Sequence, residues 1–163
     1  MNLPRKQYAD SKNLSARMDL HARFSTNPQG WMNWLFEKLD LKEAYQVLEL
    51  GCGPGGLWQN RMEALPGNFR LVMTDASPGM VSEAGARLQD ERISFQVVDA
   101  QSIPFPDRTS DAVIASHMLY HVPDITRALS EIGRVLKPSG KLFAATNGRA
   151  HLRELDDMIR SVV

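Results

Sequence analysis

The sequence has a single cysteine, no excess of charge of either sign and no long apolar run. Cys52 has no second cysteine with which to form an internal disulfide, and this favours a reducing, cytoplasmic setting. Nineteen basic residues balance 19 acidic ones, so the chain lacks the basic character typical of proteins that bind nucleic acid. No apolar stretch approaches the roughly 20 residues that cross a bilayer, and the first residues lack a secretory signal pattern. We expect neither nucleic acid nor a membrane as a partner.

What is present suits one globular domain of 163 residues, 43% of them hydrophobic. We expect an N-terminal arm and cap helix over residues 1–41, and an α/β core over 42–163. In the cap helix, Trp31 and Trp34 recur at helical spacing with two leucines. The two tryptophans are interpreted as core anchors of this helix rather than as residues that stack on a substrate.

Beyond the cap helix, short apolar segments alternate with helix-like ones. This alternation is typical of an α/β fold with a doubly wound, mainly parallel sheet and helices on both faces. Ligands of such sheets bind at the carboxyl ends of the strands, where the strand order reverses. We predict strands at 47–50, 69–74, 93–98, 111–116 and 140–146, helices at 57–65, 77–88 and 125–136, and a last helix with Leu152, Leu155, Ile159 and Val162.

The strongest local motif is the glycine-rich segment 51–56, directly after the first predicted strand. Glycines permit a tight turn from strand to helix and let a ligand approach bare backbone. Because Gly51, Gly53 and Gly56 also satisfy G-x-G-x-x-G, an NAD-binding oxidoreductase is an alternative, as is a turn that binds no ligand. Cys52 is interpreted as a small residue that fits this turn, and the alternative is a reactive thiolate at a helix start.

Acidic residues stand at the ends of the first three predicted strands. Glu49 suits an ammonium or hydroxyl donor better than a pyrophosphate, unless it merely faces solvent. Asp75 can accept hydrogen bonds from both hydroxyls of a ribose, or instead cap the next helix. Asp99 can accept from an adenine amino group while the Ala100 N–H donates to a ring nitrogen. Met80 can pack on the adenine face, although taken alone it suits a core position.

Four segments together resemble the class I S-adenosylmethionine-dependent methyltransferases of the small-molecule branch. They occur in that family's order and spacing and extend over most of the chain. The resemblance implies a Rossmann-like core, S-adenosylmethionine as cofactor, S-adenosylhomocysteine as product and a small-molecule methyl acceptor. The segments are VLELGCGPGG (47–56), LVMTDASPGMV (71–81), FQVVDAQSIPFPDRTSDAVIASHMLYHVPD (95–124) and RVLKPSGKLFAAT (134–146).

The resemblance also implies a role for each matching position. The backbone of the glycine segment would face the methionine part of the cofactor, with Glu49 near its amino group and Asp75 on the ribose. Ser116 and His117, at the end of the fourth strand, would lie beside the sulfonium. The full expected cofactor site is Glu49, Gly51, Cys52, Gly53, Asp75, Ala76, Met80, Asp99, Ala100, Gln101, Ser116 and His117.

Methyl transfer from a sulfonium needs orientation and desolvation, and a general base only where the nucleophile is protonated at neutral pH. His117, His121 and Tyr120 are candidates, but His121 also suits a structural role in a turn, so we assign no catalytic residue. No His, Cys, Asp or Glu spacing matches a metal site. The N-terminal region could fold over the cofactor as a lid, with Arg17, His21, Arg23 and Asn27 available for contacts.

The sequence departs from the family toward its C-terminus. A complete sheet of this class has seven strands, whereas five are predicted here and the C-terminal hairpin is missing. The fifth strand would then be an exposed edge through which two copies could pair as a homodimer. The alternative to an active methyltransferase is therefore a truncated or partner-dependent cofactor-binding module without independent activity.

Overall fold

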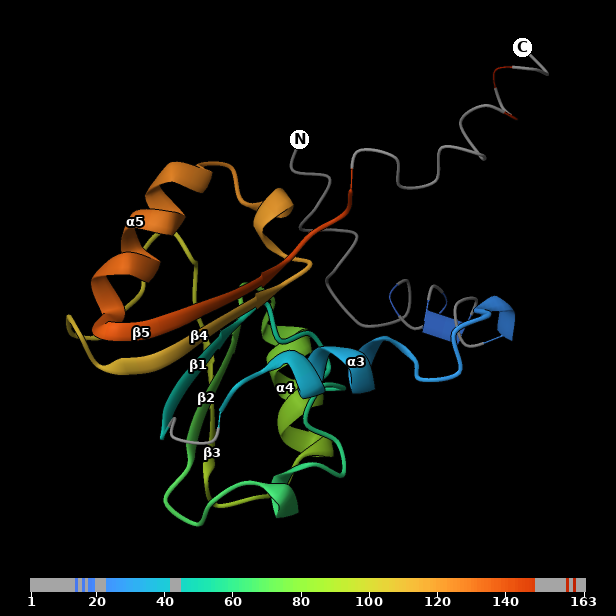
Figure 1. Ribbon diagram of the computed structural model, residues 1–163. Coiled ribbons are helices and arrows are strands. Elements are labelled where there is room, and N and C mark those ends of the chain that lie inside the picture. The colour runs from blue at the N-terminus through green and yellow to red at the C-terminus, as the bar shows by residue number, and fades with distance from the viewer. Residues whose placement is uncertain are drawn as a thin grey trace.

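A computed structural model of the chain describes residues 14, 16, 18–19, 23–41, 45–148, 158 and 160. Its described part is built on a five-stranded sheet in the order β3-β2-β1-β4-β5, and every neighbouring pair of strands is parallel (Figure 1). The strands are β1 Gln46–Leu50, β2 Arg70–Asp75, β3 Ile93–Val97, β4 Ser110–Ser116 and β5 Leu136–Ala145. The strand order reverses at β1, because the chain adds β2 and β3 on one side of it and β4 and β5 on the other.

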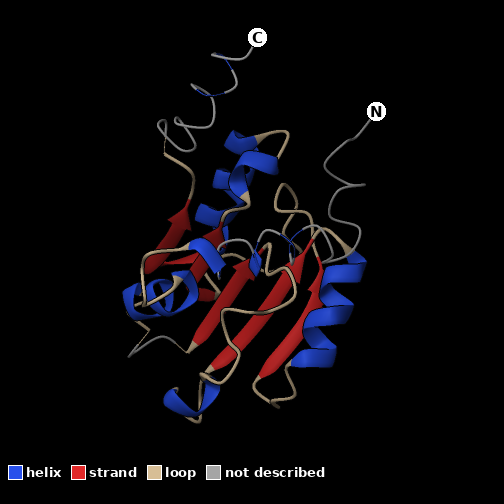
Figure 2. Cartoon of the chain, turned by 90° about the vertical axis from the view of Figure 1, so that its right-hand side faces the viewer, coloured by secondary structure: helices blue, strands red, loops and turns tan. Residues whose placement is uncertain are grey.

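Helices cover both faces of the sheet, as Figure 1 shows and Figure 2 shows from the side. On one face, Leu35 of α3 and Ala84 of α4 pack with apolar side chains of β1, β2, β3 and β4. On the other, Ala128, Ile132 and Val135 of α5 pack on Leu48 and other residues of β1 and β4. The helices are α3 Trp31–Lys38, α4 Pro78–Arg87 and α5 Ile125–Val135. The predicted doubly wound α/β architecture is therefore confirmed.

The helix starts agree with the capping residues of the sequence. Ser77 accepts a hydrogen bond from the Met80 N–H at 3.4 Å, with Pro78 at the first position of α4. Asp124 accepts from the Arg127 N–H at 2.9 Å at the start of α5. Each cap satisfies one of the backbone N–H groups that the first turn of a helix leaves without a partner.

The predicted helix over 57–65 is wrong. The chain forms successive turns there, followed by the short 3-10 helix η1 Met62–Ala64. Trp58 is fully buried, Asn60 has a φ of 60°, and the Arg61 guanidinium donates to the Leu57 carbonyl at 3.0 Å. Helical continuation is lost because the left-handed Asn60 breaks the backbone repeat and Arg61 takes a carbonyl that a helix would use.

The interpretation of Trp31 and Trp34 as core anchors is also wrong. The two side chains are 41% and 38% exposed, and α3 instead buries Leu35, with Leu39 buried at its end. The two indole rings stack on each other with centroids 5.2 Å apart. Helical spacing identifies an apolar stripe, but in α3 the leucines rather than the tryptophans face the sheet.

β5 begins earlier than the predicted 140–146. Leu136 pairs with Ser110 directly after α5, and a register shift follows before Lys141 pairs with Ala112. Within the described residues β5 pairs with β4 alone, in agreement with the predicted edge strand.

The predicted last helix and most of the N-terminal arm lie outside the described residues. In the described part of the chain, no helix is both long and apolar enough to cross a membrane.

Gly55 gives a test of the packing beneath the glycine segment. Its φ is +80°, and an added Cβ would lie 2.8 Å from the Leu88 side chain and 3.3 Å from Met73. Gly55→Ala is therefore expected to lower the free energy of unfolding by about 1–3 kcal/mol in urea titrations. Gly67→Ala is the matched control, because an added Cβ there meets nothing within 4 Å. Equal stability of the two variants would contradict this packing.

Candidate functional site

The predicted site residues meet at the carboxyl edge of the sheet. The Gly53 N–H donates to Asp75 at 3.0 Å, which joins the segment after β1 to the end of β2. The Cys52 N–H donates to the Thr74 carbonyl at 2.9 Å, and the segment after β4 packs on Gly51 through Met118. This edge is the place where a sheet with reversed strand order binds ligands.

Gly51 cannot be replaced by a larger residue without disturbing this edge. Its φ is +69°, and an added Cβ would lie 2.6 Å from the Met118 Cβ. The backbone turns sharply after β1 and passes close beneath the segment after β4. Gly53 has a φ of +54°, and among the described residues the Leu14 side chain lies 3.4 Å from the place of its Cβ.

Glu49 is buried on the α3 and α4 side of β1, with only 4% of its surface exposed. The indole Nε1–H of Trp58 donates to its carboxylate at 2.7 Å. The Thr74 hydroxyl donates to the Glu49 backbone carbonyl at 2.7 Å and fixes the strand beside β2. The alternative in which Glu49 merely faces solvent is therefore wrong.

Burial raises the pKa of Glu49 to about 7, because desolvation penalises the carboxylate. The Trp58 hydrogen bond acts in the opposite direction, and the nearby Asp75 raises the pKa further. A carboxyl group with this pKa changes charge near neutral pH. It gains most from a cationic group that approaches within hydrogen-bond distance.

Asp75 is partly buried and holds the backbone on both sides of the site. Its two carboxylate oxygens accept from the Gly53 N–H at 3.0 Å and the Ser77 N–H at 2.8 Å. Burial raises the pKa of Asp75, and these N–H groups offset part of that effect. Ser77 caps α4, so the alternative of Asp75 as the helix cap is wrong. Ala76, between Asp75 and Ser77, is exposed.

The segment after β3 contributes Asp99, Ala100 and Gln101. Asp99 is exposed and accepts from both the backbone and the side-chain amide of Gln101, each at 2.9 Å. The Gln101 side chain also accepts from the Asp124 N–H at 3.0 Å and so ties this segment to the start of α5. Ala100 and Met80 are 5% and 2% exposed, so both side chains lie inside the protein.

Ser116 and His117 follow β4 at the same edge. The His117 N–H donates to the Ala145 carbonyl at 2.8 Å, with a φ of 54° at His117. Its ring lies 4.9 Å from the Trp31 ring and 6.3 Å from the Tyr120 ring, measured between centroids. An imidazole therefore stands at the edge of the site with aromatic neighbours from α3 and from the 3-10 helix η2 Leu119–His121.

Cys52 is a free, buried thiol whose Sγ donates to the Gly53 carbonyl at 3.3 Å. Burial first, and then the negative charges of Glu49 and Asp75, raise the pKa of the thiol well above its usual value. The alternative of a reactive thiolate is not favoured by this environment. Among the described residues, no group of three or more His, Cys, Asp or Glu side chains could hold a metal ion.

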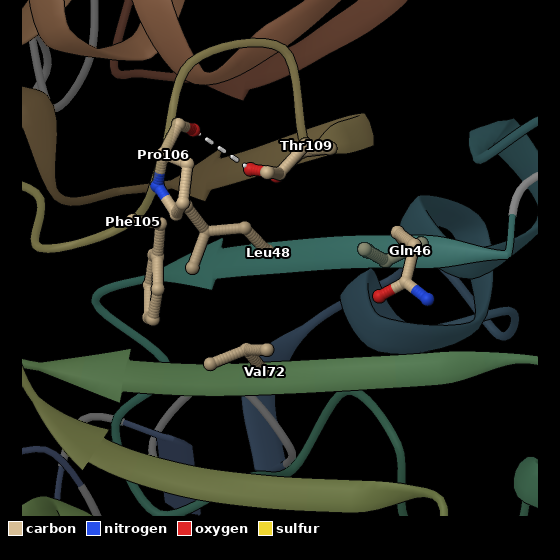
Figure 3. A pocket seen from close by; sticks show the side chains of 8 residues that line it. Gln46, Leu48, Val72, Phe105, Pro106 and Thr109 are labelled. Atoms are coloured by element: carbon tan, nitrogen blue, oxygen red, sulfur yellow. Dashed lines mark hydrogen bonds between the residues drawn. The ribbon is translucent and has the colours of Figure 1, made fainter.

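A cavity of about 170 Å³ lies away from this edge, toward the amino ends of β1 and β4 (Figure 3). Gln46, Leu48 and Val72 of the sheet face Phe105 and Pro106 of the loop before β4 across it. None of the predicted cofactor residues lines this cavity. The predicted site and the cavity are therefore separate places in the fold.

The sequence interpretation missed three contributors to the carboxyl edge. The sequence pattern predicts a helix at Trp58 and a core position for Trp31, and it indicates no role for Met118. Trp58 lies nine residues after Glu49 in the sequence, and no sequence pattern predicts that its indole N–H donates to that carboxylate. Only the fold brings these side chains to the edge.

Residues 48–144 match the protein family described as "Methyltransferase domain". The ubiquinone/menaquinone biosynthesis C-methyltransferase UbiE of Desulfotalea psychrophila is 33% identical over 130 residues, which are 78% of this chain and 52% of that protein. The methyltransferase GfsG of Streptomyces halstedii is 31% identical over 117 residues, covering 68% of this chain and 41% of that protein. The chain thus spans about half the length of these relatives.

Solved structures share the fold. One is a chain of the complex between the Haloferax volcanii Trm112 methyltransferase activator and a methyltransferase, with a TM-score of 0.68 at 26% identity over 88% of this chain and 60% of that one. Another is the YcgJ protein from Bacillus subtilis, with a TM-score of 0.61 at 26% identity over 69% of this chain and 48% of that one. By its matched domain and its fold, the chain belongs to the family of class I S-adenosylmethionine-dependent methyltransferases.

Proposed function

We propose that the chain binds S-adenosylmethionine at the carboxyl edge of the sheet and transfers its methyl group to a small-molecule acceptor. The observation that carries this proposal is the buried Glu49 carboxyl beside the bare backbone of the glycine segment, with Asp75 at the end of the neighbouring strand. Membership of the methyltransferase family supports it.

The donor set suits each part of this cofactor. Glu49 offers a carboxylate to the ammonium of the methionine part, and the glycine segment follows it at the carboxyl end of β1. Asp75 has two carboxylate oxygens that can accept hydrogen bonds from the ribose hydroxyls. These oxygens now accept from the backbone N–H groups of Gly53 and Ser77. Asp99 and the Ala100 N–H suit the adenine edge, with the buried Met80 and Ala100 side chains behind it. Ser116, His117, Ala76 and Gln101 complete the proposed site.

When bound, S-adenosylmethionine supplies a methyl group on a positively charged sulfur, and this sulfur is a leaving group that needs no further activation. The protein's own residues then hold the acceptor in line, exclude water and, where needed, receive a proton from it. His117 and His121 are candidates to receive such a proton, and no side chain is proposed as catalytic.

The names of relatives support a small-molecule acceptor. They include the UbiE C-methyltransferase of ubiquinone/menaquinone biosynthesis and the sterol 4-C-methyltransferase strm-1 of Caenorhabditis elegans, which is 34% identical over 109 residues. The balanced charge and the single cysteine support a cytoplasmic protein that does not act on nucleic acid.

A second candidate is a cofactor-binding module that needs a partner for activity. Two observations favour it: β5 pairs on one side only within the described residues, and one structural relative is from a complex with the methyltransferase activator Trm112. Pairing of two β5 edges in a homodimer is the alternative form of such an assembly. Light scattering gives the oligomeric state and a methyl-transfer assay gives the activity. Together they distinguish an active monomer from a homodimer and from a module that needs another protein.

Isothermal titration with S-adenosylhomocysteine tests the cofactor proposal. We expect one saturable site per chain, with NAD giving no comparable heat. Tight binding of NAD together with no binding of S-adenosylhomocysteine would favour the oxidoreductase alternative and contradict the proposal.

Removing the charge of Asp75 is expected to weaken cofactor binding. Asp75→Asn keeps one oxygen that accepts from the backbone but loses the charged acceptor for the ribose, so S-adenosylhomocysteine affinity should fall by about 10- to 100-fold. Glu91→Gln is the control, because Glu91 is exposed before β3, at the opposite edge of the sheet. An unchanged dissociation constant in Asp75→Asn, measured by titration, would remove Asp75 from the site.

The pKa of Glu49, raised to about 7, predicts that cofactor affinity depends on pH. The carboxyl is mostly neutral at pH 6 and mostly ionised at pH 8, so affinity for the cationic ammonium should rise by about tenfold between them. Cys52 and Asp75 face the same carboxyl, and Trp58 donates to it.

Two variants separate these contributions in the same titrations. Glu49→Gln should bind weakly and lose the dependence on pH, while Trp58→Phe should move the midpoint upward because the indole N–H lowers the pKa of Glu49. A pH profile that survives unchanged in Glu49→Gln would show that another group is responsible.

A further inference from the structure

Among the described residues, five aromatic side chains gather at the carboxyl end of β4, and we refer to them as the aromatic cluster. Ring contacts link them in sequence: Trp34 to Trp31 at 5.2 Å, Trp31 to His117 at 4.9 Å, His117 to Tyr120 at 6.3 Å and Tyr120 to His121 at 4.4 Å. The members come from α3, from the turn after β4 and from η2. Segments far apart in the sequence thus contribute to one aromatic surface.

The aromatic cluster lies directly beside the proposed cofactor site. His117 follows the last residue of β4, and its neighbour Met118 packs against Gly51 of the glycine segment. A molecule resting on the cluster would therefore lie next to the methionine part of a cofactor bound over Gly51. This is the position that a methyl acceptor must take for in-line transfer.

The exposure of the cluster is more than core packing requires. Trp31, Trp34 and Tyr120 expose 41%, 38% and 47% of their surface, whereas α3 is anchored by the buried Leu35. Large aromatic side chains that remain this exposed at the edge of a site are typical of binding surfaces.

We propose that the aromatic cluster is the acceptor-binding surface and that it selects a planar aromatic acceptor. This proposal rests on the proposed methyltransferase function and specifies its substrate class. The exposed rings of Trp31 and Tyr120 offer apolar surface on which a planar aromatic molecule can stack.

Charge argues against a cationic acceptor on the same rings. Tryptophan and tyrosine faces also attract ammonium groups, but the cofactor places a positive sulfur beside this surface and would repel a second cation. Lys38 already lies 5.9 Å from the Trp34 ring and adds positive charge on the same side.

Titrations on protein saturated with S-adenosylhomocysteine test the proposal, with 2-naphthol and its saturated counterpart decahydro-2-naphthol as probes. We expect 2-naphthol to bind at least about tenfold more tightly, because the two alcohols share a skeleton but only one has a π face. Trp31→Leu and Tyr120→Leu should each weaken 2-naphthol binding by about three- to tenfold and leave the saturated alcohol unaffected.

Tyr45→Leu is the matched control, since Tyr45 precedes β1 at the opposite edge of the sheet, and its 2-naphthol affinity should equal that of the unmodified chain. Thermal melts confirm that each variant is folded. Equal affinity for the two alcohols would overturn the proposal. Binding of S-adenosylhomocysteine is measured first on the same sample, so its loss counts against the methyltransferase function and not against the aromatic surface.

Discussion

The hydrogen bond from the Trp58 indole to the buried Glu49 carboxyl is the interaction on which the site depends. It satisfies an acid that burial would otherwise leave without a donor, and it draws Trp58 fully into the core beneath β1. The turns that replace the expected helix keep Trp58 in this buried position, and the Gly53 N–H holds the glycine segment to Asp75. An acid in this setting carries little net cost when neutral and attracts a cation when ionised.

Parallel pairing converts this local contact into a site. Glu49 pairs with Met73 of β2 and Ile114 of β4, so the strands end at similar levels and their following residues share one edge. The glycine segment, Asp75 and His117 meet there because each follows a strand of the same sheet. The cavity near Phe105 lies toward the other ends of the strands, which separates it from this chemistry.

The sequence predicts the strands and the strand-end residues well, because short apolar runs followed by Asp75 or by the glycine segment are local features. Ser77 and Asp124 likewise identify the starts of α4 and α5. The segment around Trp58 is not predictable from the sequence, since its apolar spacing fits a helix. The turns depend on the left-handed Asn60 and on the contact of Trp58 with the buried Glu49. The exposed side of Trp31 was missed because a helical repeat does not tell which stripe faces the sheet.

Amide NMR of the ¹⁵N-labelled chain during titration with S-adenosylhomocysteine tests the central claim most directly. If the carboxyl edge is the cofactor site, the largest shifts are expected at Gly51, Gly53, Ala76, Ala100 and His117. Shifts confined to Gln46, Thr109 and Ser110, which line the cavity at the amino ends of the strands, would contradict the account, as would a spectrum that does not change.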